Sequence, residues 1–155
     1  MKVLSPGVFW QDIKAGEQFK TLNRTVSETD VIQFCSVTGM LEAIFIDTTF
    51  QEQGKGGISG GRFAPAALTY TLIEGLLCQT LIQGTGLAML ELHKRVLVPV
   101  HVGDTVHAIV TVDSVKPTSK GNRAVVVSTV DVFNQHGDKV MTYRASRMLA
   151  GRPNV

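Results

Sequence analysis

The stretch Ala66–Ile82 reads Ala-Ala-Leu-Thr-Tyr-Thr-Leu-Ile-Glu-Gly-Leu-Leu-Cys-Gln-Thr-Leu-Ile, and its pattern decides the fold class. Large aliphatic side chains recur at intervals of three and four residues, which places them on one broad face of an α-helix; they are Leu68, Leu72, Ile73, Leu76, Leu77 and Leu81. Pro65 suits the first turn of this helix, where its missing N–H costs nothing. A helix that is apolar over so wide an arc is expected to be wrapped by other elements. The run is broken by Glu74 and Gly75 and is too short to span a bilayer.

Four segments rich in β-branched residues follow the helix and predict strands; they are Leu87–Val98, Thr105–Val115, Arg123–Phe133 and Val140–Leu149. Residues typical of turns connect them, at Gly103-Asp104, Lys120-Gly121-Asn122 and His136-Gly137-Asp138. One long helix followed by four strands in meander-like succession is an α+β pattern, because no βαβ spacing occurs.

The segment before the long helix predicts a strand, a short helix and a loop. Phe19–Val26 alternates well enough for a strand, and Ser27 with Asp30 predicts the start of a helix that ends near Gly39. The segment from Gln51 to Gly61 then holds five glycines. It is either a mobile surface loop or a flexible lid over a nearby pocket.

Composition describes an ordinary globular protein, and we expect residues 1–155 to form one domain. The net charge of +2 is too small to argue for nucleic acid. Cys35 and Cys78 fall in predicted helices, where reduced core thiols are expected rather than a disulfide. No apolar leader follows the first residues, so a cytoplasmic protein is expected. Neither cysteine nor histidine spacing suits a metal site.

Four motifs of the chain resemble those of one enzyme family. They are Trp10–Phe19, Val26–Asp30, Gly60–Leu68 and Val98–Thr105, the last of which reads Val-Pro-Val-His-Val-Gly-Asp-Thr. Together they resemble the MaoC-like (R)-specific enoyl-CoA hydratases and dehydratases, which are lyases of fatty acid metabolism. The resemblance implies a hot-dog fold, in which an antiparallel sheet wraps around a long central helix. It also implies a dimer, with two protomers or halves needed for each acyl-thioester site.

The family's catalytic pair of residues is missing from this chain. The matching segment, Thr38–Asp47, keeps Gly39 and Asp47, but Met40 stands at the position of the family's catalytic Asp and Phe45 at that of its catalytic His. A thioether and a phenyl ring have no exchangeable proton, so neither side chain can act as a general acid or base. A shift of register cannot supply a histidine, because the first one in the chain is His93.

The weak candidates for a substitute acid or base are Glu42 and Asp47. Glu42 would need a distorted loop, and Asp47 is more suited to holding the loop by accepting backbone N–H groups. Glu74 on the central helix could assist thioester hydrolysis, or it could be a half-buried or dimer-interface residue. The backbone N–H of Ala66 remains at the place where the family's oxyanion hole is expected.

The expected acyl-thioester pocket consists of Met40, Phe45, Arg62, Ala64, Pro65, Ala66 and Ala67. Arg62 is either a structural loop residue or a ligand for a cofactor phosphate. No permanently bound cofactor is expected, since coenzyme A or acyl carrier protein would arrive as part of the thioester. The chain is thus expected to bind acyl thioesters with doubtful hydratase activity. The alternatives are a non-catalytic subunit of a heterodimeric hydratase or a hot-dog acyl-CoA thioesterase.

The expected partners follow from the same resemblance. They are a second copy of the chain or a second hot-dog subunit, with neither nucleic acid nor a membrane involved. Among the basic residues, Arg144, Arg147 and Arg152 are expected on a solvated face, where two of them could meet nucleotide phosphates.

Overall fold

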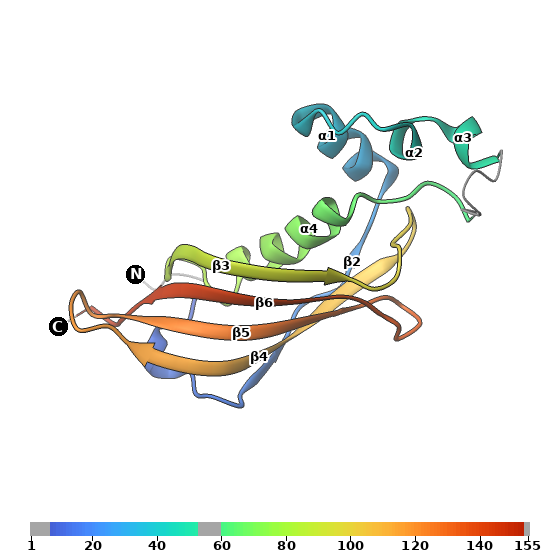
Figure 1. Ribbon diagram of the computed structural model, residues 1–155. Coiled ribbons are helices and arrows are strands. Elements are labelled where there is room, and N and C mark those ends of the chain that lie inside the picture. Colours follow the sequence, from blue (N-terminus) through green and yellow to red (C-terminus); the bar gives the residue numbers. More distant parts are fainter. Residues whose placement is uncertain (1–6, 53–59, 154–155) are drawn as a thin grey trace, which may run out of the picture.

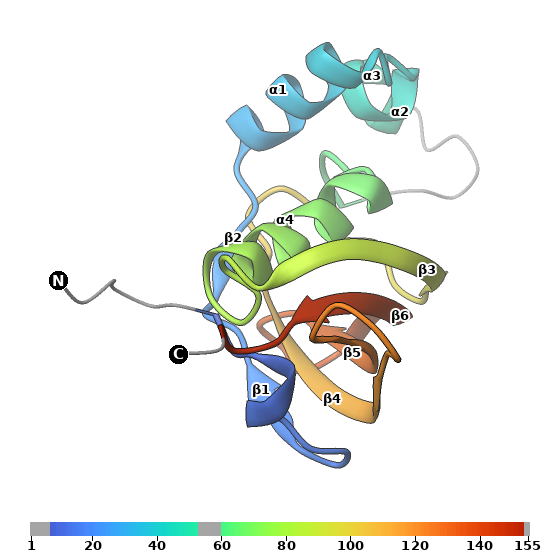
Figure 2. The same cartoon turned by 90° about the vertical axis from the view of Figure 1, so that its left-hand side faces the viewer.

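A computed structural model describes residues 7–52 and 60–153, and shows one long helix lying across an antiparallel sheet (Figure 1). The long helix is α4, and three short helices form an overhang above its N-terminal end (Figure 2). The helical elements are η1 (Trp10–Asp12), α1 (Glu28–Thr38), α2 (Ala43–Ile46), α3 (Thr48–Glu52) and α4 (Ala66–Gln79). The strands are β1 (Gln18–Lys20), β2 (Arg24–Thr25), β3 (Gly86–Val96), β4 (Thr105–Pro117), β5 (Arg123–Phe133) and β6 (Lys139–Ala150). The predicted α+β class is confirmed, with the four long strands within about two residues of their expected bounds.

The order of the strands differs in one respect from a simple meander. The sheet runs β1-β4-β5-β6-β3, so β4, β5 and β6 form the expected meander while β3 pairs with β6 at the edge. After β3, the chain crosses back past the start of α4, where Ala64 N donates to Val100 O and Val102 N donates to Arg62 O. The loop that begins β4 is thereby attached to the segment that begins α4.

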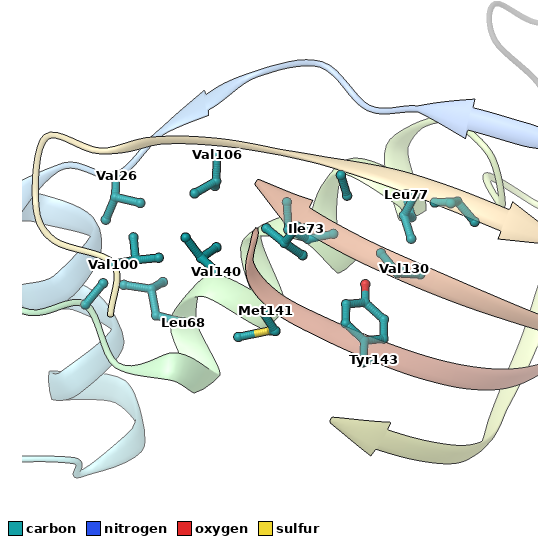
Figure 3. Close-up of a cluster of buried hydrophobic side chains, with 14 of the residues drawn as sticks. Val26, Leu68, Ile73, Leu77, Val100, Val106, Val130, Val140, Met141 and Tyr143 are labelled. Carbon is teal, nitrogen blue, oxygen red and sulfur yellow. The ribbon is translucent and has the colours of Figure 1, made fainter. Parts of the chain in front are cut away.

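The core lies between α4 and the inner face of the sheet (Figure 3). In β5 every second residue is buried, which is the period expected of a strand with one covered face. The helix buries Leu68, Thr69, Ile73 and Leu77. Its other side, including Thr71 and Cys78, is exposed. The sheet of one chain therefore covers one face of α4 and does not wrap it completely.

The N-terminal part confirms the predicted helix start and divides the predicted strand. Ser27 Oγ accepts from Asp30 N at 3.1 Å while Asp30 Oδ2 accepts from Ser27 N at 2.8 Å, which is a capping box. Gly39 ends α1 in the left-handed conformation at φ 72°. The expected strand Phe19–Val26 is two short strands, β1 and β2, which both pair with β4.

The two cysteines, both expected to be core thiols, differ in their burial. Cys35 is buried as predicted, but Cys78 is exposed, so the prediction of a core thiol is wrong there; both cysteines are free. Residues three and seven apart lie on the same face of a helix, so Cys78 lies on the open side of α4 with Gly75 and Thr71.

Most of the glycine-rich segment, residues 53–59, lies outside the described residues. None of the described helices has the length and hydropathy needed to cross a membrane.

Candidate functional site

An apolar hollow lies between the overhang and the segment that leads into α4. We call it the overhang hollow; its volume is about 230 Å³, and it is lined by Val31, Ile32, Cys35, Ser36, Leu41, Phe45, Ile46 and Arg62. The structure thus brings together Phe45 and Arg62, two of the residues that the sequence assigned to an acyl-thioester pocket. They come from α2 and from the loop before α4, seventeen residues apart in the chain.

Arg62 fastens the overhang to the start of α4. Its Nη1 donates to Phe45 O at 2.5 Å, and its Nε lies 2.7 Å from Glu28 Oε1. The side chain is only 17% exposed. One guanidinium therefore connects α1, α2 and the α4 segment, which is the structural role that the sequence left open for it.

Met40 does not line the overhang hollow. The left-handed turn at Gly39 is followed by a tight bend in which Leu41 N donates to Gly39 O at 2.8 Å. This bend turns Leu41 toward the hollow and leaves Met40 exposed. Of the two positions that we expected, from the resemblance, at the place of the catalytic pair, only Phe45 faces the hollow.

The two weak acid candidates are both engaged in helix capping. Glu42 precedes α2, and its Oε1 accepts from Ala43 N at 3.2 Å. Asp47 Oδ1 accepts from Thr49 N at 2.9 Å and from Thr49 Oγ1 at 2.7 Å. Neither residue lines the overhang hollow. Their carboxylates accept from donors within the overhang.

The first turn of α4 follows the Arg62 segment, but the expected pocket residues Ala64, Pro65, Ala66 and Ala67 do not line the overhang hollow. Pro65 is the N-cap, one position earlier than the sequence indicated, and Ala66 is the first helical residue. Ala64 and Pro65 are buried, whereas Ala66 and Ala67 are half-buried. The first N–H groups of a helix have no partner within it, and the helix dipole favours negative charge there. This end of α4 can therefore donate to a carbonyl oxygen.

The electrostatics of the overhang hollow do not favour proton transfer. Among the described residues that line it, none is an aspartate, a glutamate or a histidine. Burial raises the pKa of the Cys35 thiol, although the Arg62 guanidinium opposes this effect. The thiol consequently stays protonated and unreactive at neutral pH. The hollow can hold an apolar group, but its side chains offer no general base.

A second polar cluster, which sequence reasoning missed, joins α4 to β6. Glu74 Oε1 accepts from Arg147 Nη2 at 2.5 Å and from Tyr143 Oη at 2.6 Å. Burial, followed by the nearby Glu74 carboxylate, raises the pKa of Tyr143 far above its ordinary value. The expected solvated face is therefore wrong for Arg147, which is buried. The period-2 pattern of β6 was the available signal, because it places Arg147 on the same face as Tyr143.

The other two arginines of that predicted group point elsewhere. Arg144 Nε lies 3.6 Å from Asp113 Oδ2 on the outer face of the sheet, and Arg152 pairs with Asp12 beside the N-terminal segment. The three arginines thus form no common patch.

Comparisons with solved structures identify the fold. The chain superposes with a TM-score of 0.82 on a monoamine oxidase regulatory protein from Archaeoglobus fulgidus, at 27% identity over 95% of this chain and 97% of that one. It superposes equally well, at 0.82, on a MaoC-like dehydratase from Rhodospirillum rubrum, at 22% identity over 96% of this chain and 100% of that one. No family model matches the sequence, and no curated protein sequence matches it.

A third neighbour is a complex of two subunits. The chain matches the HadBC (3R)-hydroxyacyl-ACP dehydratase of Mycobacterium tuberculosis with a TM-score of 0.70, at 16% identity over 88% of this chain and 97% of that one. Further neighbours include (R)-hydratases and a protein with a double hot-dog fold. The expected hot-dog fold is confirmed, and the structural neighbours are the MaoC-like dehydratases and (R)-hydratases that the sequence motifs resemble.

Proposed function

We propose that this protein binds acyl thioesters of coenzyme A or of an acyl carrier protein, and that the chain alone does not hydrate enoyl thioesters. One observation supports both parts of the proposal. The overhang hollow is apolar, and its lining includes Arg62, which lies four residues before the first residue of α4, but its described lining holds no acid or base. The acyl chain would occupy the hollow, and the first turn of α4 would hold the thioester carbonyl.

The expected loss of hydratase activity follows from the chemistry of hydration. A base must activate water, and an acid must deliver a proton to the α-carbon of the enoyl group. Each positioned acid or base typically contributes about 10²–10⁴ in rate. Phe45 faces the hollow and Met40 lies outside it. Neither side chain has an exchangeable proton, so neither position supplies a general acid or base. The remaining oxyanion donors support binding more than catalysis.

A second candidate, a non-catalytic subunit of a two-part hydratase, is favoured by the edge strand β3. All eleven residues of β3 are exposed, and its outer edge has no partner strand in the described chain. Leu87 and Leu90 are each about half exposed. An exposed, apolar edge strand is a site of pairing with another chain. The partner is either a second copy of this chain or another hot-dog subunit that carries the missing catalytic pair.

The thioesterase alternative has less support from the geometry. The carboxylates of Glu42 and Asp47 cap short helices, and Glu74 is bound by Arg147 and Tyr143. Each is committed to a structural contact, so none is positioned to activate water in the overhang hollow.

Calorimetric titration with crotonyl-coenzyme A and with free coenzyme A tests the proposed function. We expect the thioester to bind in the micromolar to millimolar range and free coenzyme A to bind more weakly, because it lacks the acyl group. Phe45→Ala should weaken thioester binding by removing a wall of the hollow. Val37→Ala is the matched control, since Val37 is 83% exposed and does not line the hollow. Absence of binding at millimolar thioester would refute the proposal.

A further inference from the structure

The edge strand β3 carries its charged residues in an order that suits pairing with an identical strand. Its regular part is residues 91–96, which pair with β6 without a shift in register. This part reads Glu-Leu-His-Lys-Arg-Val. Glu91 and Arg95 lie four residues apart, so the period of two in a strand places their opposite charges on the same face of the sheet.

The two faces of β3 differ in character. The residues that lie opposite buried residues of β6 face the same side as α4; they are Leu92, Lys94 and Val96. The outer face carries Glu91, His93 and Arg95. A lysine often protects an edge strand from pairing. Lys94 is held within its own chain instead, because its Nζ lies 5.1 Å from the centroid of the Tyr70 ring.

The charges of the outer face are available to another chain. Arg95 forms no ion pair with the residues that the structure describes. Glu91 Oε1 lies 3.2 Å from His93 Nε2, but these two side chains are 60% and 79% exposed. So exposed a pair contributes little to stability. Glu91 can therefore turn to a stronger partner at little cost.

Two-fold symmetry limits how β3 can pair with a copy of itself. One residue then stands opposite itself, and facing side chains share a face of the sheet. A centre at Glu91, Lys94 or Arg95 places like charges directly opposite each other, which is destabilising. A centre at Leu92 leaves Arg95 without an acid. Only a centre at His93 places Glu91 of each protomer opposite Arg95 of its partner.

We propose that β3 pairs in antiparallel fashion with β3 of a second copy of this chain, centred on His93 and stabilised by two Glu91–Arg95 ion pairs. This inference rests on the second candidate of the proposed function, in which β3 pairs with another chain, and it identifies that chain as an identical copy. A strand that pairs with a different subunit has no need of charges that complement themselves.

Sedimentation equilibrium of the natural chain and of charge variants tests the ion pairs. The natural chain should be a dimer. Glu91→Arg or Arg95→Glu alone turns both opposite-charge pairs into like-charge pairs, so each should raise the Kd of the dimer by at least about tenfold. The two changes together exchange the charges and should restore dimerisation. Lys120→Glu is the matched control, because Lys120 is exposed in the turn between β4 and β5.

A cysteine scan tests the register. In a Cys78→Ser background, which removes the exposed natural thiol, Leu92→Cys, His93→Cys and Lys94→Cys are each oxidised in solution. Only the cysteine at position 93 would stand opposite its own copy. At positions 92 and 94 the two copies are displaced by about 7 Å along the strand, which is too far for a disulfide. A disulfide-linked dimer is therefore expected from His93→Cys alone.

Three outcomes would overturn the proposal: a natural chain that sediments as a monomer at high micromolar concentration, a dimer that the charge reversals do not weaken, or a disulfide at position 92 or 94 but not at 93. If a charge variant does not fold, the cysteine scan decides. Neither measurement involves a thioester. A monomeric chain would therefore leave the proposed thioester binding standing, and failure to bind crotonyl-coenzyme A would leave the dimer standing.

Discussion

The ion pair between Glu74 and Arg147 gives the sharpest prediction about stability. The two side chains are 15% and 7% exposed, so solvent screens their interaction little. Arg147→Met leaves the carboxylate without its counterion, and removing one partner of a buried pair typically costs about 3–5 kcal/mol. Because Tyr143 still donates to Glu74, we expect about 3 kcal/mol, at the lower end of that range. At about 2–4 °C per kcal/mol for a chain of this length, the melting temperature should fall by about 6–12 °C.

The double variant distinguishes a buried ion pair from a packing effect. Glu74→Leu should also destabilise the protein, since it leaves the Arg147 guanidinium unpaired. Combining it with Arg147→Met should recover the loss that comes from the unpaired charge, because an apolar pair of similar volume replaces the charges. A deficit of about 1–3 kcal/mol should remain, because the buried Tyr143 hydroxyl has lost its acceptor. Urea unfolding of the four proteins gives the interaction energy as a double-mutant cycle. Single variants that differ from the natural chain by less than about 0.5 kcal/mol, or effects that simply add, would refute the reasoning.

Three further predictions concern other parts of the chain. Gly75→Ala should raise the free energy of unfolding, measured in urea, by about 0.5–1 kcal/mol. Alanine favours a helix interior over glycine, and the added methyl group meets open space. A loss of stability would show that this side of α4 is covered. Burial opposes ionisation of Asp131, but its hydrogen bonds, led by that from Lys139, hold its pKa below the ordinary value. The stability that comes from this lowered pKa is present above about pH 4 and is lost as the pH falls through the folded-state pKa. Asp131→Asn should therefore be less stable than the natural chain at neutral pH, and this difference in the free energy of unfolding should shrink below about pH 4 in acid-unfolding curves. A difference that does not depend on pH would contradict this. Phe45→His combined with Met40→Asp should raise the rate of crotonyl-thioester hydration by about 10²-fold, measured as the decrease in enoyl absorbance. This is the lower end for one positioned group, because Met40 lies outside the hollow. A variant that folds and binds the thioester but hydrates it no faster would argue against the placement of these two positions.

The sequence predicted the elements well because their signals are local. The aliphatic spacing within residues 66–82 marks a helix, and Ser27 with Asp30 marks the start of another, since capping depends on neighbours three residues apart. The position of β3 beside β6 was not predictable in this way. It depends on where the chain crosses the start of α4 after β3. Hydrogen bonds between residues far apart in sequence, such as Ala64 and Val100, fix that crossing.

The candidate site was predictable only in part for the same reason. Phe45 and Arg62 were assigned to one pocket by resemblance, and they do line one hollow. Met40 lies outside it because the left-handed turn at Gly39 changes the direction of the next side chain, which residue identity alone does not show. The bond between Glu74 and Arg147 joins residues 73 positions apart, and no local pattern pairs them.

One measurement tests the central claim about binding and chemistry together. Crotonyl-coenzyme A is observed by proton NMR in heavy water with a substoichiometric amount of the protein, and the crotonyl methyl signal reports both events. The proposed function predicts that this signal broadens with the natural chain, broadens much less with Phe45→Ala, and keeps its chemical shift for as long as the sample is followed. A signal that stays sharp would contradict thioester binding, and the appearance of a 3-hydroxybutyryl methyl signal would contradict the loss of hydratase activity.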